Sequence, residues 1–496
     1  MQVFWILRKD VRHLWPQILM VLGVTAMIGW LNIAMSAGNP LQPVLSAIWV
    51  LAGMYLGASV IHEERLPGHE QYWLTRPYSR SGLLLAKVLF MLVFLALPML
   101  AADSIVLAID GVSPLRWVPR LLFTALVYVP AFALVVAALA AVTGTLLQYF
   151  WALLAVGGLE IAAFAAGNPK NLGWGNLEWL RSSALGAIIL GASIVVLIVQ
   201  YARRNTMASR GILSAAALVA AAGPFLGDWH QAFALESRFA NRPMDLAPVR
   251  LSFEPSRKAP PGYDLGAMEP RSGETGIALP ILVGGLPAGD RLVSERISAT
   301  IQASGKSWTS AWTARGGIAN LNPLEDRRLV RPDGAYWLYL DIDRSFYRAV
   351  KDVPVRLHAS VAVTLLGGAQ SGSLAPRGRT GPLQGDAICS VGPGPYANLI
   401  VTCAWPFRTP AGAYIQARSL RTGQASESVL VPPGPYRPFS LNGLLWDWAA
   451  ASFSEPPPPA ELKLETWQAV AGFERDLDIP QIRLGEYADR RIADPQ

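Results

Sequence analysis

The chain has 496 residues, of which 52% are hydrophobic and only 16% are charged, whereas ordinary soluble domains carry about 25% charged residues. The net charge is +7, but the lysines and arginines are scattered without a basic cluster, which argues against nucleic-acid binding. Long apolar runs fill residues 1–228, and residues 229–496 mix polar with apolar residues. The composition predicts a membrane-embedded part followed by a soluble part.

Residues 1–15 predict an amphipathic helix that lies in the headgroup layer of a membrane. Its apolar residues repeat at helical spacing: Val3, Leu7, Val11 and Leu14. Its basic residues fill the other side: Arg8, Lys9, Arg12 and His13. A cleaved signal peptide is the alternative, but the apolar run that follows is longer than a usual signal core and further spans come after it.

Residues 16–228 predict a bundle of about seven membrane spans, because a helix needs roughly 20 apolar residues to cross a bilayer. The predicted spans are Pro16–Ser36, Val44–Ile61, Leu83–Leu107, Leu121–Leu147, Phe150–Ala166, Ala184–Tyr201 and Gly211–Leu226. Residues 121–166 are too long for one crossing, so we expect the chain to turn back between Gly144 and Tyr149.

The distribution of lysine and arginine among the short loops predicts that the N-terminus lies on the cytosolic side of the membrane. With that orientation the inner loops carry Arg8, Lys9, Arg12, Arg65, Arg76, Arg80, Lys87, Arg203, Arg204 and Arg210. The outer loops carry Arg116, Arg120, Lys170 and Arg181. Seven crossings then place residues 229–496 outside, which predicts a bacterial cytoplasmic (inner) membrane protein with an extracytoplasmic, periplasmic C-terminal domain.

Glu160 is the one formal charge inside the fifth predicted span, and a charge at that depth usually faces a cavity or a partner. The alternative is that the helix bends or starts later, which leaves Glu160 near the outer headgroups. Asp103, toward the end of the third span, is expected at the outer interface.

Residues 229–496 predict an all-β, sandwich-like domain, in one or two subdomains, because short alternating segments are separated by Gly and Pro turns. The predicted strands are Arg291–Ala303, Tyr336–Asp343, Val353–Leu366, Asn398–Ala404, Ala413–Ser419, Glu427–Val431 and Pro480–Leu484. The two cysteines, Cys389 and Cys403, are either buried free thiols or a disulfide between neighbouring strands, which requires an oxidising compartment.

The sequence contains only fragments of catalytic motifs. Gly305-Lys306-Ser307 has the end of a nucleotide-binding loop, but its leading glycine is missing, so we expect a hairpin turn and no ATPase site in this chain. His62-Glu63-Glu64 lacks the second histidine of a zinc-protease helix, and no metal site is predicted. His230 and His358 are expected to stand alone in the β half, so no catalytic residue is assigned.

The polar stretch from His62 to Arg80 lies between two membrane-length runs and must face water on one side of the bilayer. It carries an acidic pair, a glycine, an aromatic stretch and a Pro-Tyr-Ser-Arg corner, and a lysine opens the next span. These residues are Glu63, Glu64, Gly68, Tyr72, Trp73, Leu74, Arg76, Pro77, Tyr78, Ser79, Arg80 and Lys87. Together with the amphipathic N-terminal helix, residues 1–210 resemble type-2 ABC transporter permease subunits.

The resemblance implies a permease that pairs with a second permease subunit, identical or different, and docks on a separate cytosolic ATPase that holds ATP and Mg²⁺. The polar loop would be the coupling helix, with Trp73 and Leu74 as apolar anchors. Its charged contacts would be Glu63, Glu64, Arg76 and Arg80. The chain itself would bind no cofactor and would contact membrane lipid. The usual family form has six spans, and this chain adds a seventh and a large outer domain.

Two functions from different classes follow. In the first, the chain is the permease of an ABC-type exporter and couples the partner's ATP hydrolysis to movement of a substrate. In the second, it is a non-transporting membrane-anchored sensor or scaffold whose outer β-sandwich binds a protein or glycan.

Overall fold

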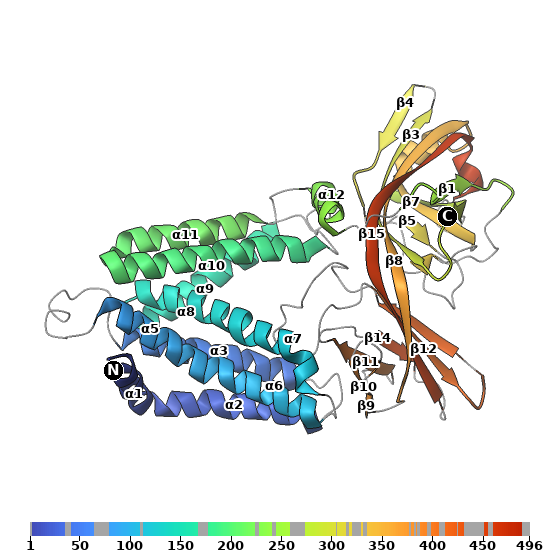
Figure 1. The fold of residues 1–496 in the computed structure, drawn as a ribbon. Coiled ribbons are helices and arrows are strands. Elements are labelled where there is room, and N and C mark those ends of the chain that lie inside the picture. Colours follow the sequence, from blue (N-terminus) through green and yellow to red (C-terminus); the bar gives the residue numbers. More distant parts are fainter. Residues whose placement is uncertain are drawn as a thin grey trace.

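The computed structural model describes residues 2–34, 41–63, 79–109, 113–166, 177–223, 228–240, 245–257, 273–303, 305–313, 317–319, 329–330, 335–375, 378–380, 383, 387–393, 398–405, 412–423, 425–430, 451–454 and 460–488. A helical bundle comes first, and a β region follows at one end of it (Figure 1). The N-terminus lies at the opposite end of the bundle, which we call the N-terminal rim.

Among the described residues, six helical stretches are long and apolar enough to cross a membrane: Trp15–Ile33, Val44–His62, Ser81–Ile109, Pro114–Val142, Leu146–Ala163 and Leu180–Arg203. The seventh predicted span corresponds to α11 (Thr206–Ala222), an apolar helix of 17 residues that is shorter than these six. It runs beside α10 (Glu178–Arg203) in the bundle (Figure 1). The part of the chain that the structure describes is therefore a multi-pass bundle with six candidate spans and one shorter apolar helix.

The bundle begins with α1 (Gln2–His13), the predicted amphipathic helix, followed by α2 (Trp15–Ala34), α3 (Leu41–His62) and α5 (Arg80–Met91). Its next elements are η1 (Leu92–Ala96), α6 (Leu97–Ile109), η2 (Pro114–Trp117), α7 (Val118–Phe123), η3 (Thr124–Tyr128), α8 (Val129–Val142) and α9 (Leu146–Ala166). The break between α8 and α9 confirms the predicted reversal near Gly144.

In the described residues, two spans contain a π-helical turn, η1 or η3, that ends two positions before a proline. Leu97, the residue before Pro98, donates its N–H to Leu92 O five residues back. Val129, the residue before Pro130, donates to Thr124 O in the same way. Proline has no N–H and its ring presses on the carbonyl four residues back, so a widened turn relieves the clash without ending the span.

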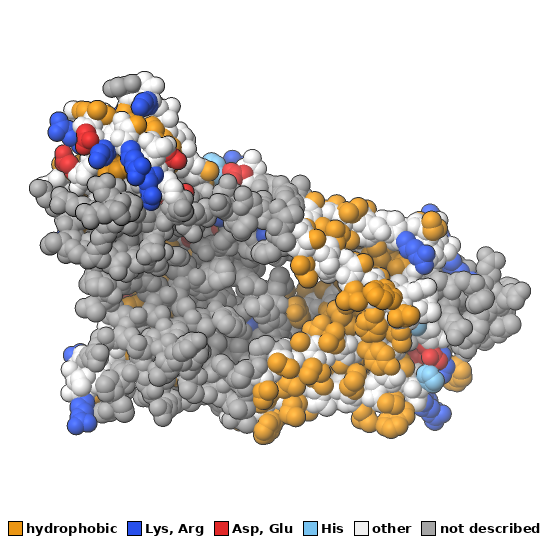
Figure 2. All heavy atoms as spheres, turned by 180° about the vertical axis from the view of Figure 1, so that it is seen from behind, with side chains coloured by type: hydrophobic (Ala, Val, Ile, Leu, Met, Phe, Trp, Pro, Cys, Tyr) orange, Lys and Arg blue, Asp and Glu red, His pale blue; other side chains and the backbone are white. Residues whose placement is uncertain are grey.

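The outer surface of the bundle is apolar, as the hydrocarbon of a bilayer requires. On α9, Trp151, Leu154 and Ile161 are 64%, 63% and 72% exposed. Figure 2 shows hydrophobic side chains gathered over the helical part as seen from behind. Soluble monomers rarely expose an apolar surface of this extent, so the surface supports contact with lipid.

The described strands of the β region form three antiparallel sheets with the strand orders β1-β2-β7-β5, β14-β11-β10-β9 and β13-β12-β15-β8-β3-β4, and β6 also pairs with β3. The third sheet curls into a half-barrel (Figure 1). The strands are β1 (Arg250–Phe253), β2 (Glu274–Gly284), β3 (Arg291–Ala303), β4 (Lys306–Thr309), β5 (Gly317–Ala319), β6 (Leu329–Val330), β7 (Ala335–Asp343), β8 (Val355–Leu374), β9 (Gly378–Thr380), β10 (Ile388–Pro393), β11 (Asn398–Ala404), β12 (Gly412–Ser419), β13 (Ala425–Leu430), β14 (Ala451–Ser454) and β15 (Ala460–Ile482).

Each small sheet packs on a different part of the half-barrel sheet, which gives two apolar cores. The first core joins β2 and β7 to β3, β8 and β15, and includes Leu279, Leu338 and Leu477. The second core joins β10 and β11 to β12, β8 and β15, and includes Val391 and Leu464. The predicted sandwich is thus one long curled sheet with a smaller sheet against each end.

The strand predictions vary in accuracy. Arg291–Ala303 and Asn398–Ala404 are confirmed with the same bounds as β3 and β11. The predicted hairpin at Gly305 is also confirmed, because Ala303 pairs with Lys306 and Gly305 has a φ of 86°. The predicted final strand Pro480–Leu484 is confirmed only in part, because residues 480–482 end the much longer last strand, β15, and Leu484 begins a 3₁₀ turn.

The described residues of the predicted all-β region also include two α-helices, α12 (Trp229–Ala240) and α13 (Arg344–Val350). Helix α12 lies between the bundle and the half-barrel sheet (Figure 1). Its Trp229 and Phe233 share an apolar cluster with Leu177 at the start of α10 and Ala362 on β8. The helix therefore forms a joint between the two parts of the molecule.

Candidate functional site: the N-terminal rim

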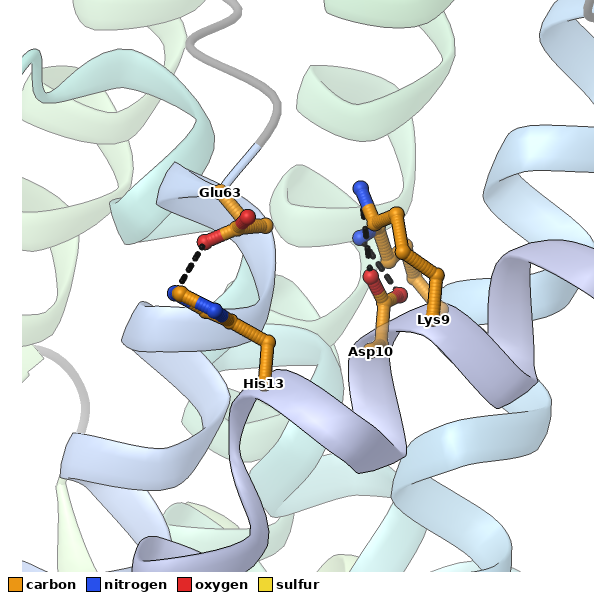
Figure 3. Close-up of polar contacts among 5 residues, drawn as sticks. Lys9, Asp10, His13 and Glu63 are labelled. Atoms are coloured by element: carbon orange, nitrogen blue, oxygen red, sulfur yellow. Dashed lines mark hydrogen bonds and ion pairs between the residues drawn. The ribbon is translucent and has the colours of Figure 1, made fainter.

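A fully buried ion pair links α1 to α5 at the N-terminal rim. Lys87 Nζ lies 2.7 Å from Asp10 Oδ2, and the two residues are 1% and 0% exposed. Lys9 Nζ lies 3.5 Å from the other carboxylate oxygen, Asp10 Oδ1. Figure 3 shows Lys9 and Asp10 side by side on α1. A buried charge needs such a partner, so the pair fixes the position of α1 against the third span.

The sequence does contain a signal for this pair. Asp10 is the sole acidic residue of α1, and it follows the amphipathic pattern onto the buried side with Ile6 and Leu14. Lys87 is the sole charge in the apolar run 83–102. Two isolated opposite charges in apolar surroundings indicate a pair, whereas the resemblance to a permease accounts for Lys87 only as the lysine that opens the third span.

A second ion pair links α1 to the end of α3. His13 Nε2 lies 3.4 Å from Glu63 Oε2, and their side chains are 65% and 28% exposed. Figure 3 shows the two side chains pointing toward each other from α1 and the end of α3. Because His13 faces solvent, this contact holds α1 less firmly than the buried pair does.

Two further contacts join the other helix ends at the rim. His62 Nε2 donates to Ala140 O at 3.0 Å, since a carbonyl can only accept, and Thr143 Oγ1 lies 3.1 Å from the same nitrogen. Arg210 Nε on α11 donates to Val142 O at 3.1 Å. The ends of α3, α8 and α11 are therefore tied together beside the α1 contacts.

The start of α5 is capped locally. Ser79 Oγ accepts a hydrogen bond from Gly82 N at 3.1 Å, and Ser79 N donates to Gln2 Oε1 of α1 at 3.5 Å. A Cβ on Gly82 would lie 2.7 Å from Ser79 Oγ, so a larger residue at this position would require the Ser79 side chain to shift. The Pro-Tyr-Ser-Arg corner singled out in the sequence thus ends in a helix N-cap.

The predicted coupling loop falls mostly outside the described residues. Glu63 is described and pairs with His13. Arg80 begins α5, and its side chain is not described. The named loop residues that lie outside the described ranges are Glu64, Gly68, Tyr72, Trp73, Leu74, Arg76, Pro77 and Tyr78. The structure nevertheless places both ends of this loop at the rim.

Two further sequence predictions concern Glu160 and the cysteines. Glu160 lies on α9, as expected, and its side chain is outside the described part of the structure. Cys389 on β10 lies directly opposite Cys403 on β11, and the two sulfur atoms are bonded. Both cysteines are fully buried in the second β core.

The histidines of the β region are not alone, contrary to the sequence expectation. His230 Nε2 lies 2.7 Å from Glu474 Oε1, which adds a polar contact between α12 and β15. His358 Nδ1 lies 2.9 Å from Asp478 Oδ1, and Ser360 Oγ lies 3.4 Å from His358 Nε2.

The Ser360, His358 and Asp478 side chains have the residue types of a hydrolase triad but not the geometry that catalysis requires. Ser360 Oγ donates to Asp476 Oδ1 at 2.6 Å, so its proton is directed away from His358. The strand around Ser360 pairs with β3 and β15 on both sides, so its backbone N–H groups are already bonded and form no oxyanion hole. We interpret this cluster as cross-strand polar pairing.

Comparison with known proteins adds no family assignment. No protein-family model matches the chain, and no curated protein sequence matches it. Among solved structures, a transglutaminase from red sea bream is 10% identical with a TM-score of 0.12, covering 50% of this chain and 33% of that protein. The matched part is about a third of that protein, and a likeness this weak carries no argument about fold or activity.

Proposed function

We propose that the chain is the membrane-spanning permease subunit of an ABC-type exporter, and that the N-terminal rim is where a separate cytosolic ATPase acts. The observation that carries the proposal is the buried Asp10–Lys87 pair, which binds α1 to α5 next to the connection between α3 and α5. A force applied to residues 64–78 would enter α3 and α5 directly and pass to α1 through this pair.

The tied helix ends support the same role. Glu63 and His62 connect α3 to α1 and α8, and Arg210 connects α11 to α8. A soluble ATPase can move a membrane bundle only through contacts that do not yield when pushed. Polar ties at one end of otherwise apolar helices supply that stiffness, since breaking them leaves buried polar groups unpaired.

The disulfide in the β region, at the opposite end of the molecule, supports an extracytoplasmic location for this region. A disulfide between Cys389 and Cys403 fits an oxidising compartment, whereas the cytosol keeps thiols reduced. Helix α11 would complete the seventh crossing, because 17 residues rise about 26 Å, close to the hydrocarbon thickness. In a bacterial inner membrane, the N-terminal rim then faces the cytosol. The excess of lysine and arginine at the rim agrees with this orientation.

The test is purification of the tagged chain from its native membranes and detection of an ABC ATPase that is recovered with it, with Trp73→Ala/Arg76→Ala as the test variant. We expect the double substitution to abolish recovery of the ATPase while the permease stays monodisperse. Leu420→Ala/Arg421→Ala, at an exposed turn of the β region, is the matched control and should retain the ATPase. Equal recovery with the test variant would reject the coupling role.

The same experiment separates the alternative function. A membrane-anchored sensor or scaffold would have no ATPase partner, and pull-down would instead recover proteins bound to the β region. Removal of residues 64–78 would then leave its binding unchanged, whereas a permease would lose its ATPase.

A further inference from the structure

An apolar pocket opens between the third and fourth spans close to the N-terminal rim. Its volume is about 230 Å³. Thirteen residues from α3, α5, η1, η3, α8 and α10 line it, and all except Lys87 are apolar. Val88 and Leu126 are among them and are 37% and 61% exposed, so the pocket communicates with the outer surface of the bundle.

The position of the pocket along the membrane spans determines which medium its opening faces. Its lining runs along α5 from Leu84 to Met91 and along α8 from Val129 to Ala137, inside two candidate spans. At about 1.5 Å per residue, these segments extend roughly 10–12 Å along the bundle axis. The medium around them is hydrocarbon, and an apolar space left unfilled would lose dispersion contacts that a lipid chain can supply.

The polar end of the pocket carries excess positive charge. Lys87 both lines the pocket and forms the ion pair with Asp10, whose other oxygen faces Lys9. Helix α1 carries two further cations, Arg8 and Arg12, which lie exposed, and Asp10 is its one acidic residue. A headgroup with a net negative charge complements this excess better than a zwitterionic one does.

We infer that this pocket binds one acyl chain of an anionic glycerophospholipid, with the lipid phosphate beside Lys9 at the rim. The occupant follows from three observations together: an apolar elongated pocket, an opening toward hydrocarbon, and excess positive charge where the headgroup layer lies. The site requires only that the helices span a bilayer, and it stands whether or not an ATPase docks on the chain. The π-turns η1 and η3 both contribute to it, through Leu92 and Leu126.

The test is native mass spectrometry of the full-length protein released from nanodiscs that contain equal amounts of phosphatidylglycerol and phosphatidylcholine with identical chains. We expect one retained phosphatidylglycerol per chain after detergent has removed exchangeable lipid, with a preference of roughly fivefold over phosphatidylcholine, as one or two added charges provide. Equal retention of the two lipids, or retention of neither, would overturn the inference.

Variants separate the chain-binding part from the headgroup part. Ala133→Phe fills the pocket and should remove the retained lipid, and Leu134→Trp does the same from a less buried position if the first variant does not fold. Lys9→Gln leaves the pocket open and should abolish the preference between the two lipids. Ala215→Phe, on the exposed side of α11, is the matched control and should behave as the unaltered protein. Full retention by a folded pocket-filling variant would also overturn the inference.

Discussion

Arg120 Nη1 on α7 donates a hydrogen bond of 2.8 Å to the backbone oxygen of Trp405, which directly follows β11, 285 residues further along the chain. Arg120 is buried, and its charge acts on Asp103, which the sequence placed at the outer interface and the structure buries. Beside it, Trp117 and Leu121 pack on Ile388 of β10. This contact and the α12 joint together attach the β region to two separate parts of the bundle.

Replacing Arg120 by alanine should loosen the β region from the bundle. The substitution leaves the Trp405 carbonyl and the Asp103 carboxylate without their cationic partner, and an unpaired buried polar group costs about 1–3 kcal/mol. Limited proteolysis of the membrane-inserted protein should then release the β region faster than from the unaltered protein. Arg116→Ala removes an exposed arginine from η2, the turn directly before α7, and should leave the cleavage rate unchanged. Identical cleavage of both variants would show that Arg120 does not hold the two parts together.

Breaking the Asp10–Lys87 pair should destabilise the bundle strongly. Lys87→Met leaves the Asp10 carboxylate buried without its closest cation, which costs about 3–5 kcal/mol. The double variant Asp10→Leu/Lys87→Met removes both charges and should recover most of this loss in thermal unfolding. His13→Ala, which breaks the more exposed pair, should cost no more than about 1 kcal/mol. A double variant no more stable than Lys87→Met would contradict direct pairing.

Removing the disulfide should lower the stability of the second β core. Cys389 and Cys403 close a loop with a sequence separation of 14, for which loss of the bond costs about 3 kcal/mol. In thermal unfolding, the free energy of unfolding of Cys389→Ala/Cys403→Ala should be lower by this amount. A reductant should no longer change it. The unaltered protein should take up no alkylating reagent until it is reduced. Two reactive thiols in the mature, unreduced protein would reject the bond.

Asp343 should make a pH-dependent contribution to stability through the N-terminus of α13. Its Oδ1 accepts hydrogen bonds from the Ser345 hydroxyl and from the backbone N–H groups of Phe346 and Ser345, each backbone bond being 2.9 Å. These bonds lower the pKa of Asp343 below its usual 3.8, and the bond from the Ser345 hydroxyl has the largest effect. The contribution is therefore fully present above about pH 4–5 and is lost as pH falls through the lowered pKa.

The measurement is thermal unfolding of Asp343 variants between about pH 3 and pH 7, a range that spans the usual titration of an aspartate. Asp343→Ala should cost about 1 kcal/mol at neutral pH, the usual value of an N-cap, and the difference should shrink as the pH is lowered. Asp343→Asn keeps a capping side chain that does not titrate, so it should stay close to the unaltered protein at neutral pH. A deficit for Asp343→Ala that does not change with pH would exclude an ionised cap.

The bundle was predictable because its signal is local. Runs of some 20 apolar residues specify a spanning helix whatever they pack against, and the α8–α9 reversal follows from length alone. The π-turns at Pro98 and Pro130 were not foreseen, since proline in a span can kink, break or widen the helix and the choice depends on neighbouring helices. Asp10 and Lys87 each stand out as an isolated charge in apolar surroundings, but they lie 77 positions apart, so their contact follows only from the packing of α1 on α5.

Strand β15 shows why the β region was harder to predict. Its residues 474–478, Glu-Arg-Asp-Leu-Asp, look like a polar loop, and Pro480 usually ends a strand. They form strand because pairing with β8 satisfies the backbone and leaves charged side chains on an exposed face, where Asp478 meets His358. Tertiary pairing therefore decided what the local sequence left open.

The central position of β15 sets the order in which the β region can be completed. The strand comes after every other named strand in the chain, yet it lies between β12 and β8 and supplies Leu464 to one core and Leu477 to the other. During synthesis, neither core can close until the β15 residues that complete it have left the ribosome, Leu464 for the second core and Ile482 for the first. The membrane helices are inserted long before that moment, so a nearly finished β region must wait open beside the bilayer for its last strand.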